Sequence, residues 1–389
     1  MMKVHQKPIM PKGFKCASKN CGLKEKEKDL AIFYSEVSAN AAGVFTRNKF
    51  PGASIILGRE IIKNGSLRAI VVNSKIANVG TGQQGIANAK RMAEAVAREL
   101  NIPLQEVIMS STGIIAKQLP IELIEQGIKG ISKQLGDDPV EAVKGMMTTD
   151  TYPKALSLPI GNAIMTIVGK GSGMIGPNLA TMLVYIFTDA KIVSSKLDRM
   201  LREAVDVSFN MLSVDGDTST SDTCIIMANG LAGKVDDKLF AEALKFGCIE
   251  MAKMLARDGE GATKLLEATV LGAKSNQEAK IIAKSLINSP LIKTMAYGAD
   301  PNIGRVLMAV GKCTSCEIRP EKIEVKINDV LVFANEEKVN FDEQKIRTLL
   351  RSNTVKITVN LNIGSATATA YGCDLTEGYI KENAAYYSS

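Results

Sequence analysis

At 389 residues, the chain is long enough for one large domain or two ordinary ones, and with 46% hydrophobic and 23% charged residues it is not a disordered protein. No apolar run approaches the ~18 residues of a membrane helix, and the N-terminus lacks the apolar segment of a signal peptide, so we expect a cytoplasmic protein without membrane contact. The net charge of +7 is spread along a chain with no Trp and 5% aromatic residues, which argues against nucleic-acid binding.

Strand-like and helix-like segments alternate through the first two thirds of the chain. Residues 67–73 form an apolar run typical of a buried strand, and residues 84–100 have apolar side chains at helical spacing. Residues 182–187 are continuously apolar, as in a strand buried on both faces. Helical periodicity returns at 197–207 and at 236–256.

The last third is richer in strand patterns. Residues 323–327 and 330–333 flank Asn328-Asp329, which predicts a hairpin. Residues 355–361 alternate between apolar and polar side chains, as in a half-buried strand, and residues 366–371 continue in the same style. Long helices combined with many alternating strands predict a layered α/β (α+β) protein, while periodicity leaves the order of the strands open.

Cysteine and histidine usage limits the chemistry. Seven cysteines, an odd number, favour reduced thiols over a disulfide framework. Cys16 with Cys21 and Cys313 with Cys316 could together hold zinc, but the spacing is irregular, so we expect free thiols and no metal. Because His5 is the only histidine, a nucleophile activated by histidine is nearly excluded.

The segment 170–190, KGSGMIGPNLATMLVYIFTDA, has a pattern suited to self-cleavage. Glycine-rich turns lead to Thr181, which opens the apolar strand. An N→O acyl shift would free the α-amine of Thr181, and with an ordinary pKa of ~7.7–8.0 that amine can serve as general base for its own hydroxyl. The simpler alternative is a β-branched residue that merely begins a strand.

The strings around Thr181 closely resemble the processing site of the ornithine acetyltransferase / glutamate N-acetyltransferase family of arginine biosynthesis. Further resemblance, in order and over nearly the whole length, lies in STG at 111–113, TTDT at 148–151, SVDGDTST at 213–220, DGEGATK at 258–264, DPN-x-GR at 300–305 and YIKENA at 379–384. One departure is that Lys75 and Ile76 stand where the family has Gly and Asn.

The resemblance implies a role for nine residues. It places self-cleavage between Ala180 and Thr181, makes Thr181 the nucleophile, and assigns the oxyanion hole to the hydroxyl of Thr112 and the backbone N–H of Gly113. Lys170 would bind a substrate carboxylate and Glu260 a substrate amino group, because an amino-acid substrate carries both charges. The implied substrate-binding residues are Thr148, Lys170, Thr181, Glu260, Asn383 and Ser388.

The resemblance also implies a fold and a reaction. The fold is an αββα-type sandwich shared with β-aminopeptidases, in which residues 1–180 (α chain) and 181–389 (β chain) fold together and assemble as an α2β2 heterotetramer. N2-acetylornithine would acetylate Thr181, and glutamate would then take the acetyl group, with acetyl-CoA as a further donor and no cofactor or metal. The alternatives are a self-processing amidase or aminopeptidase that uses water as acceptor, and an unprocessed binding protein.

Overall fold

The computed structural model describes residues 4–5, 7–176 and 182–384 and divides the chain into two compact units. Unit 1 comprises Met1–Gly171, Asn178–Asp206 and Thr218–Met251, and unit 2 comprises Ser172–Pro177, Val207–Asp217 and Ala252–Ser389. Each unit therefore contains residues from both sides of the predicted cleavage point. The predicted α and β chains are divisions of the covalent chain and do not coincide with these units.

Unit 1 is built on an 8-stranded sheet, in which seven strands follow the order β4-β3-β2-β8-β7-β6-β5 and the eighth, β1, pairs with β2. The pairs β3–β4 and β7–β8 are parallel and the others are antiparallel. The strands are β1 (Phe14–Lys19), β2 (Leu30–Phe45), β3 (Ser66–Asn73), β4 (Val107–Ser111), β5 (Lys154–Ile160), β6 (Ala163–Lys170), β7 (Leu183–Ala190) and β8 (Thr223–Gly233).

Aromatic contacts show that this sheet folds over itself into two facing layers. The first part of β2 pairs with β1 and β3, and its last part pairs with β8. Phe33 in that first part stacks on Phe187 of β7 with ring centroids 5.2 Å apart, and Phe14 of β1 lies 5.3 Å from the same ring. Since β8 separates β2 from β7 within the sheet, these contacts run across the layers, where a buried apolar cluster fills the space.

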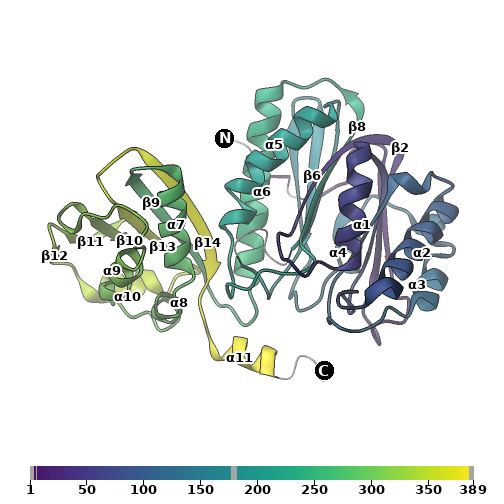
Figure 1. Cartoon of the computed structure of the whole chain (residues 1–389). Helices are drawn as coiled ribbons and strands as arrows, with labels where there is room; N and C mark the ends of the chain where they lie inside the picture. The colour runs from purple at the N-terminus through teal and green to yellow at the C-terminus, as the bar shows by residue number, and fades with distance from the viewer. Residues whose placement is uncertain (1–3, 6, 177–181, 385–389) are drawn as a thin grey trace. The chain divides into compact units, whose positions relative to one another are not determined.

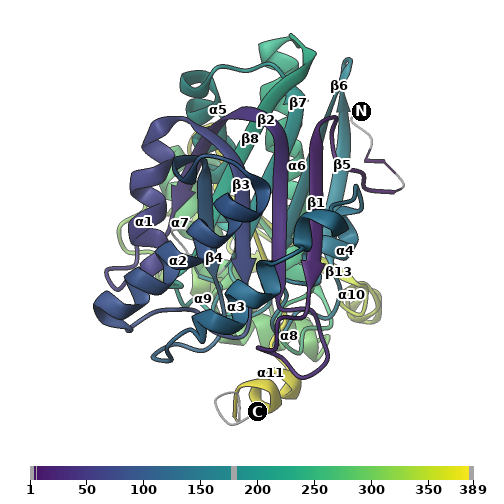
Figure 2. The same cartoon turned by 90° about the vertical axis from the view of Figure 1, so that its right-hand side faces the viewer.

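Helices cover both outer faces of the two layers in unit 1 (Figure 1). On one side α1 (Ala53–Ile61), α2 (Gly82–Leu100) and α3 (Ile121–Ile128) bury an apolar cluster against β2, β3 and β4, and Figure 2 shows α2 and α3 lying over these strands. On the other side lie α5 (Ser194–Asp206) and α6 (Asp237–Arg257). The short helix α4 (Pro139–Val143) packs into the core between the layers. Unit 1 is thus the predicted αββα sandwich.

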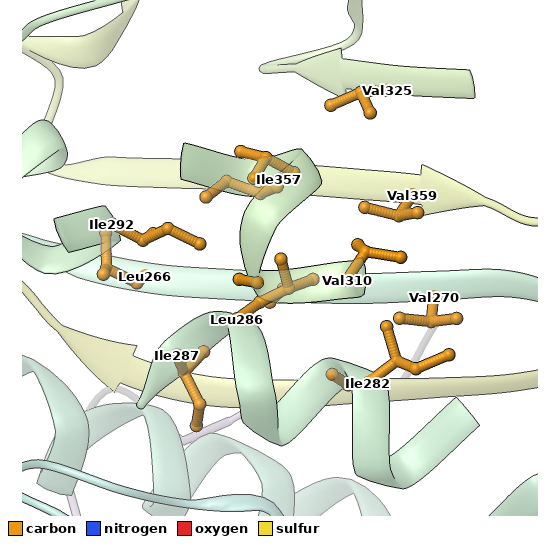
Figure 3. Close-up of a cluster of buried hydrophobic side chains, with 14 of the residues drawn as sticks. Leu266, Val270, Ile282, Leu286, Ile287, Ile292, Val310, Val325, Ile357 and Val359 are labelled. Atoms are coloured by element: carbon orange, nitrogen blue, oxygen red, sulfur yellow. The ribbon is translucent and has the colours of Figure 1, made fainter. Parts of the chain in front are cut away.

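Unit 2 is a six-stranded sheet with the order β12-β11-β10-β13-β9-β14, in which β9 and β13 are parallel. Its helices α7, α8, α9 and α10 enclose an apolar core in which Ile282, Leu286 and Val310 face Val270 and Ile357 of the sheet (Figure 3). The elements are β9 (Leu265–Ala273), α7 (Asn276–Ile287), α8 (Pro290–Tyr297), α9 (Ile303–Gly311), β10 (Glu324–Ile327), β11 (Val330–Ala334), β12 (Glu337–Lys338), α10 (Glu343–Leu350), β13 (Thr354–Asn360), β14 (Ala366–Cys373) and α11 (Glu377–Ala384).

Most of the elements predicted from periodicity are confirmed. The predicted hairpin is the antiparallel pair β10–β11, with Asn328 and Asp329 at φ +43° and +67°, as its tight turn requires. The helix predicted at 197–207 is α5, which begins at Ser194 and ends at Asp206. Within the described residues, no helix is both long enough and apolar enough to span a membrane.

Candidate active site

Three strand ends of unit 1 bring predicted site residues together. Thr112 follows the last residue of β4, Lys170 ends β6, and Lys170 pairs with Leu183 at the start of β7. The Lys170 Nζ donates a hydrogen bond to the Thr112 Oγ1 at 3.1 Å. Lys170 is 2% exposed and Thr112 3% exposed, so Lys170 is not a surface charge. The structure therefore joins the predicted carboxylate-binding cation to the predicted oxyanion hydroxyl.

Gly113 occupies a backbone position that only glycine fits. Its φ is +125°, and a Cβ at this residue would lie 2.2 Å from the carbonyl carbon of Lys75. The neighbouring Ile114 donates its N–H to the Lys75 oxygen at 2.9 Å, and Thr112 donates to the Asn73 oxygen at 3.1 Å. Among the described residues, the N–H of Gly113 has no such acceptor. The backbone is thus fixed on both sides of the predicted oxyanion donor.

Lys75 itself has a left-handed backbone. Its φ is +79°, a conformation that costs an ordinary side chain roughly 1–2 kcal/mol relative to the right-handed region. This is the position at which the sequence departs from the family's glycine. The departure therefore falls on the segment that packs directly against Gly113.

Asp150 links the TTDT segment to the end of β6. Its Oδ1 accepts from the Lys154 Nζ at 2.6 Å and from the Gly171 N–H at 2.7 Å, and its Oδ2 accepts from the Thr148 N–H at 3.0 Å. Burial raises the pKa of Asp150, but the charges of Lys154 and Lys170 outweigh it and hold the pKa at about 2. Asp150 therefore stays ionised and fixes the backbone on which Thr148 and Lys170 depend.

Asp222 contacts the residue that follows the predicted nucleophile in the sequence. Its Oδ1 accepts from the Met182 N–H at 3.0 Å, and the Met182 oxygen accepts from the Thr223 N–H at 3.0 Å. Asp222 is fully buried, and this burial raises the pKa of its carboxyl group well above the ordinary value, against the opposing effects of the Met182 N–H and Lys170. Burial therefore favours the protonated form of this carboxyl group.

The resemblance to the family's motifs did not imply a role for either Asp150 or Asp222. Asp150 stood inside the quoted TTDT string, and Asp222 stood just beyond SVDGDTST. Their burial was the missing information, since a carboxyl group in a turn-rich polar string is ordinarily exposed.

Unit 2 brings Glu260 and Asn383 together. The Asn383 Nδ2 donates to the Glu260 Oε2 at 2.8 Å, and the Glu260 N–H donates to the Ser172 oxygen at 2.9 Å. A Cβ on Gly173 would lie 2.3 Å from the Glu260 carboxyl carbon, so only glycine permits this approach. The half-buried Glu260 carboxylate is therefore held between the segment that follows Gly171 and helix α11.

Asp215 is a turn residue, as expected for the SVDGDTST string. Its carboxylate accepts the N–H groups of Met174 at 2.7 Å, Ile175 at 2.9 Å and Asp217 at 3.1 Å. The pKa of Tyr379 rises to about 12, first by burial and then by the charges of Asp215 and Glu260. This part of unit 2 is thus acidic around Glu260, which suits a cationic amino group.

Three of the predicted site positions, Ala180, Thr181 and Ser388, lie outside the described residues. All seven cysteines are described and are free thiols. In residues 4–5, 7–176 and 182–384, no group of three or more His, Cys, Asp or Glu side chains could hold a metal ion.

Comparison with known proteins gives matches along nearly the whole chain. It matches the ArgJ family over residues 15–388. An arginine biosynthesis bifunctional protein ArgJ of Clostridium acetobutylicum is 48% identical over 381 residues, which cover 97% of this chain and 98% of that protein. A glutamate N-acetyltransferase of Streptomyces clavuligerus is 40% identical over 386 residues, with 97% and 98% covered. The crystal structure of arginine biosynthesis bifunctional protein ArgJ from Bacillus halodurans aligns with a TM-score of 0.50 and 41% identity over 52% of this chain and 98% of the solved chain. The chain belongs to the ArgJ family.

Proposed function

We propose that this ArgJ family member is an acetyltransferase of arginine biosynthesis that transfers acetyl from N2-acetylornithine to glutamate through an acetyl-Thr181 intermediate. The observation that carries the proposal is the buried contact of Lys170 with Thr112 at the end of β6, beside the start of β7. The names of the relatives support the same reaction, since they include arginine biosynthesis proteins and a glutamate N-acetyltransferase.

The chemistry uses the α-amine of Thr181 as the base. The amine takes the hydroxyl proton of Thr181 while the hydroxyl oxygen attacks the acetyl carbonyl carbon, and the carbonyl oxygen becomes an oxyanion. The proton then passes to the ornithine nitrogen as its bond to the acetyl carbon breaks, leaving acetyl-Thr181. The amine of glutamate attacks this ester in the second half of the cycle, loses a proton, and leaves as N-acetylglutamate while Thr181 regains its hydroxyl.

The oxyanion in both halves would be stabilised by Thr112 and Gly113. Since the Thr112 oxygen already accepts from Lys170, the hydroxyl proton is available to another acceptor, and the cation polarises it. The N–H of Gly113 would supply the second donor. Preorganised donors of this kind are each worth ~10²–10³ in rate.

Charge recognition would use one cation and one carboxylate. Lys170 would bind the substrate carboxylate and Glu260 the substrate amino group, with Thr148, Asn383 and Ser388 as further contacts. The reaction needs no cofactor or metal, and acetyl-CoA would be a further acetyl donor. We place the enzyme in the cytoplasm as an α2β2 heterotetramer.

Two observations support self-cleavage between Ala180 and Thr181. The Bacillus halodurans chain is matched over 98% of its length yet spans 52% of this chain, as one of two cleavage products would. Strands from both sides of the cleavage point also pair, β6 with β7 and β2 with β8, so the two products would stay associated.

A self-processing amidase would use the same Thr181 chemistry with water as acceptor. The test is to incubate the protein with N2-acetylornithine and glutamate and to measure N-acetylglutamate and free acetate together. N-acetylglutamate as the main product supports the transferase, whereas acetate formed at the same rate with and without glutamate overturns it. A parallel incubation with acetyl-CoA shows whether it is a second donor.

Replacing Gly113 by Ala should slow acetyl transfer by ~10²–10³-fold, because the added Cβ collides with Lys75 and displaces the oxyanion donor. Gly82 is the matched control, since its φ is +60° and nothing lies within 4 Å of a Cβ placed there. The Gly82→Ala variant should lose roughly 1–2 kcal/mol of stability from backbone strain and keep its rate. Equal rates for the two variants would remove Gly113 from the oxyanion hole.

Replacing Glu260 by Gln should lower kcat/KM for N2-acetylornithine by roughly 10- to 100-fold, because a charge-assisted contact to the substrate is lost. The stability should change by no more than about 0.5 kcal/mol. Glu267 is a control in the same unit, since its carboxylate pairs with the Lys253 Nζ at 3.4 Å, and Glu267→Gln should leave the kinetics intact. A Glu260 variant that melts early with normal kinetics would show a structural role, and the cleaved fraction is measured in every preparation.

A further inference from the structure

Asp222 is held by three strands where β7 begins. Its backbone oxygen accepts from the Thr46 N–H at 3.0 Å, directly after the end of β2, and it immediately precedes Thr223, the first residue of β8. Its side chain accepts from the Met182 N–H, directly before β7. Both backbone polar groups of Met182 are therefore bonded to the Asp222-Thr223 dipeptide.

The second carboxyl oxygen of Asp222 has no hydrogen-bond partner in the described part of the chain, although it is buried. The hydroxyl of the neighbouring Thr46 donates to the Ser219 oxygen at 2.6 Å. A buried polar atom without a partner costs roughly 1–3 kcal/mol, so such an atom in a native structure calls for an explanation.

We propose that Asp222 is a positioning residue for self-cleavage and acetyl transfer: it fixes the amide of Met182, the first described residue after the predicted cleavage point, and its second carboxyl oxygen is left without a partner among the described residues. The inference rests on the proposed function. The amide nitrogen of Met182 is covalently bonded to the carbonyl carbon of Thr181, so holding this N–H restrains the peptide plane that includes that carbonyl.

Burial raises the pKa of Asp222 and so favours the protonated carboxyl group. A protonated carboxyl group accepts through one oxygen and donates through the other. An asparagine side chain offers the same pair of groups with nearly the same shape, whereas alanine offers neither.

The test compares Asp222→Asn with Asp222→Ala in the full chain. Each protein is made by cell-free translation, and the fraction cleaved at Thr181 is followed over time by mass spectrometry. Asp222→Ala should cleave roughly 10- to 100-fold more slowly than the parent, and Asp222→Asn should stay within a few-fold of the parent. In the cleaved fractions, Asp222→Ala should lower kcat and leave KM unchanged, because Asp222 does not contact the substrate.

Asp189 provides the control for lost stability. It lies in β7, is 5% exposed, and its carboxylate accepts the N–H groups of Ile164 at 2.7 Å and Lys12 at 3.2 Å. Asp189→Ala should melt earlier than the parent but cleave at the parent's rate. If Asp189→Ala and Asp222→Ala slow cleavage equally, the effect is general destabilisation and the inference is overturned.

The remaining outcomes separate the inference from the proposed function. Asp222→Asn as slow as Asp222→Ala would indicate an ionised base and overturn the positioning role. If the Asp222→Ala variant cleaves itself and transfers acetyl as fast as an active parent, only the inference is overturned. A parent chain that neither cleaves nor transfers acetyl overturns the proposed function.

Discussion

Replacing Thr181 by Ala is expected to leave one intact chain of 41.7 kDa and to lower acetyl transfer by at least about 10⁴-fold. The variant loses the hydroxyl that would attack both the preceding peptide bond and the acetyl donor. Thr181→Ser keeps a hydroxyl at the same position, so it should still cleave and transfer at measurable rates. Intact-mass analysis and the formation of N-acetylglutamate are measured on the same preparations.

The control for this variant is a threonine in β7, the strand that follows Thr181 in the sequence. Thr188 is fully buried in β7, and its Oγ1 accepts from the Ala190 N–H at 3.2 Å. Thr188→Ala should lower the melting temperature yet cleave and transfer normally. A Thr181→Ala variant that transfers acetyl as fast as the parent would contradict the assignment of the nucleophile.

Replacing Asp150 by Ala should cost about 3–5 kcal/mol of stability, because the buried Lys154 ammonium would lose the carboxylate that neutralises it. Both side chains of this ion pair are fully buried, at an N–O distance of 2.6 Å. Replacing both residues together, with Ala for Asp150 and Met for Lys154, should recover part of the loss, since the Lys154 charge is removed together with its partner. Urea unfolding of the parent, the single variant and the double variant measures both effects.

The same carboxylate predicts an acid dependence of stability. The pKa of Asp150 falls from an ordinary 3.8 to about 2, so the unfolded chain binds the proton more tightly than the folded one. The stabilisation, about 2 kcal/mol, is therefore complete above pH 3.8 and is lost as the pH falls through about 2. Asp150→Asn should lack this part of the acid dependence, and an unchanged pH profile would contradict the assignment.

Hydrophobic periodicity predicted the helices and strands whose buried side chains recur at regular spacing. The alternation at 355–361 became β13, in which Val355, Ile357 and Val359 are buried, and the apolar face at 84–100 became α2. Local patterns did not predict the folding of one sheet into two layers, because this depends on contacts between distant residues such as Phe33 and Phe187. They also could not show the division into two units, which interleaves three segments of the chain in each unit.

The site was predicted only in part, for a physical reason. The strings identified Thr112, Lys170 and Glu260, and the structure gives each a specific contact, with Lys170 on Thr112 and Asn383 on Glu260. Asp222 was not singled out, because a linear string reveals neither its burial nor its contact with Met182.

The most direct measurement is the location of the acetyl group after a single half-reaction. The purified protein is mixed with N2-acetylornithine without glutamate, quenched in acid, and analysed by peptide mass spectrometry. We predict two chains, with the second beginning at Thr181 and carrying one acetyl group on the Thr181 side chain, and addition of glutamate before quenching should remove it. An intact chain that still makes N-acetylglutamate, or an acetyl group on another residue, would contradict the account.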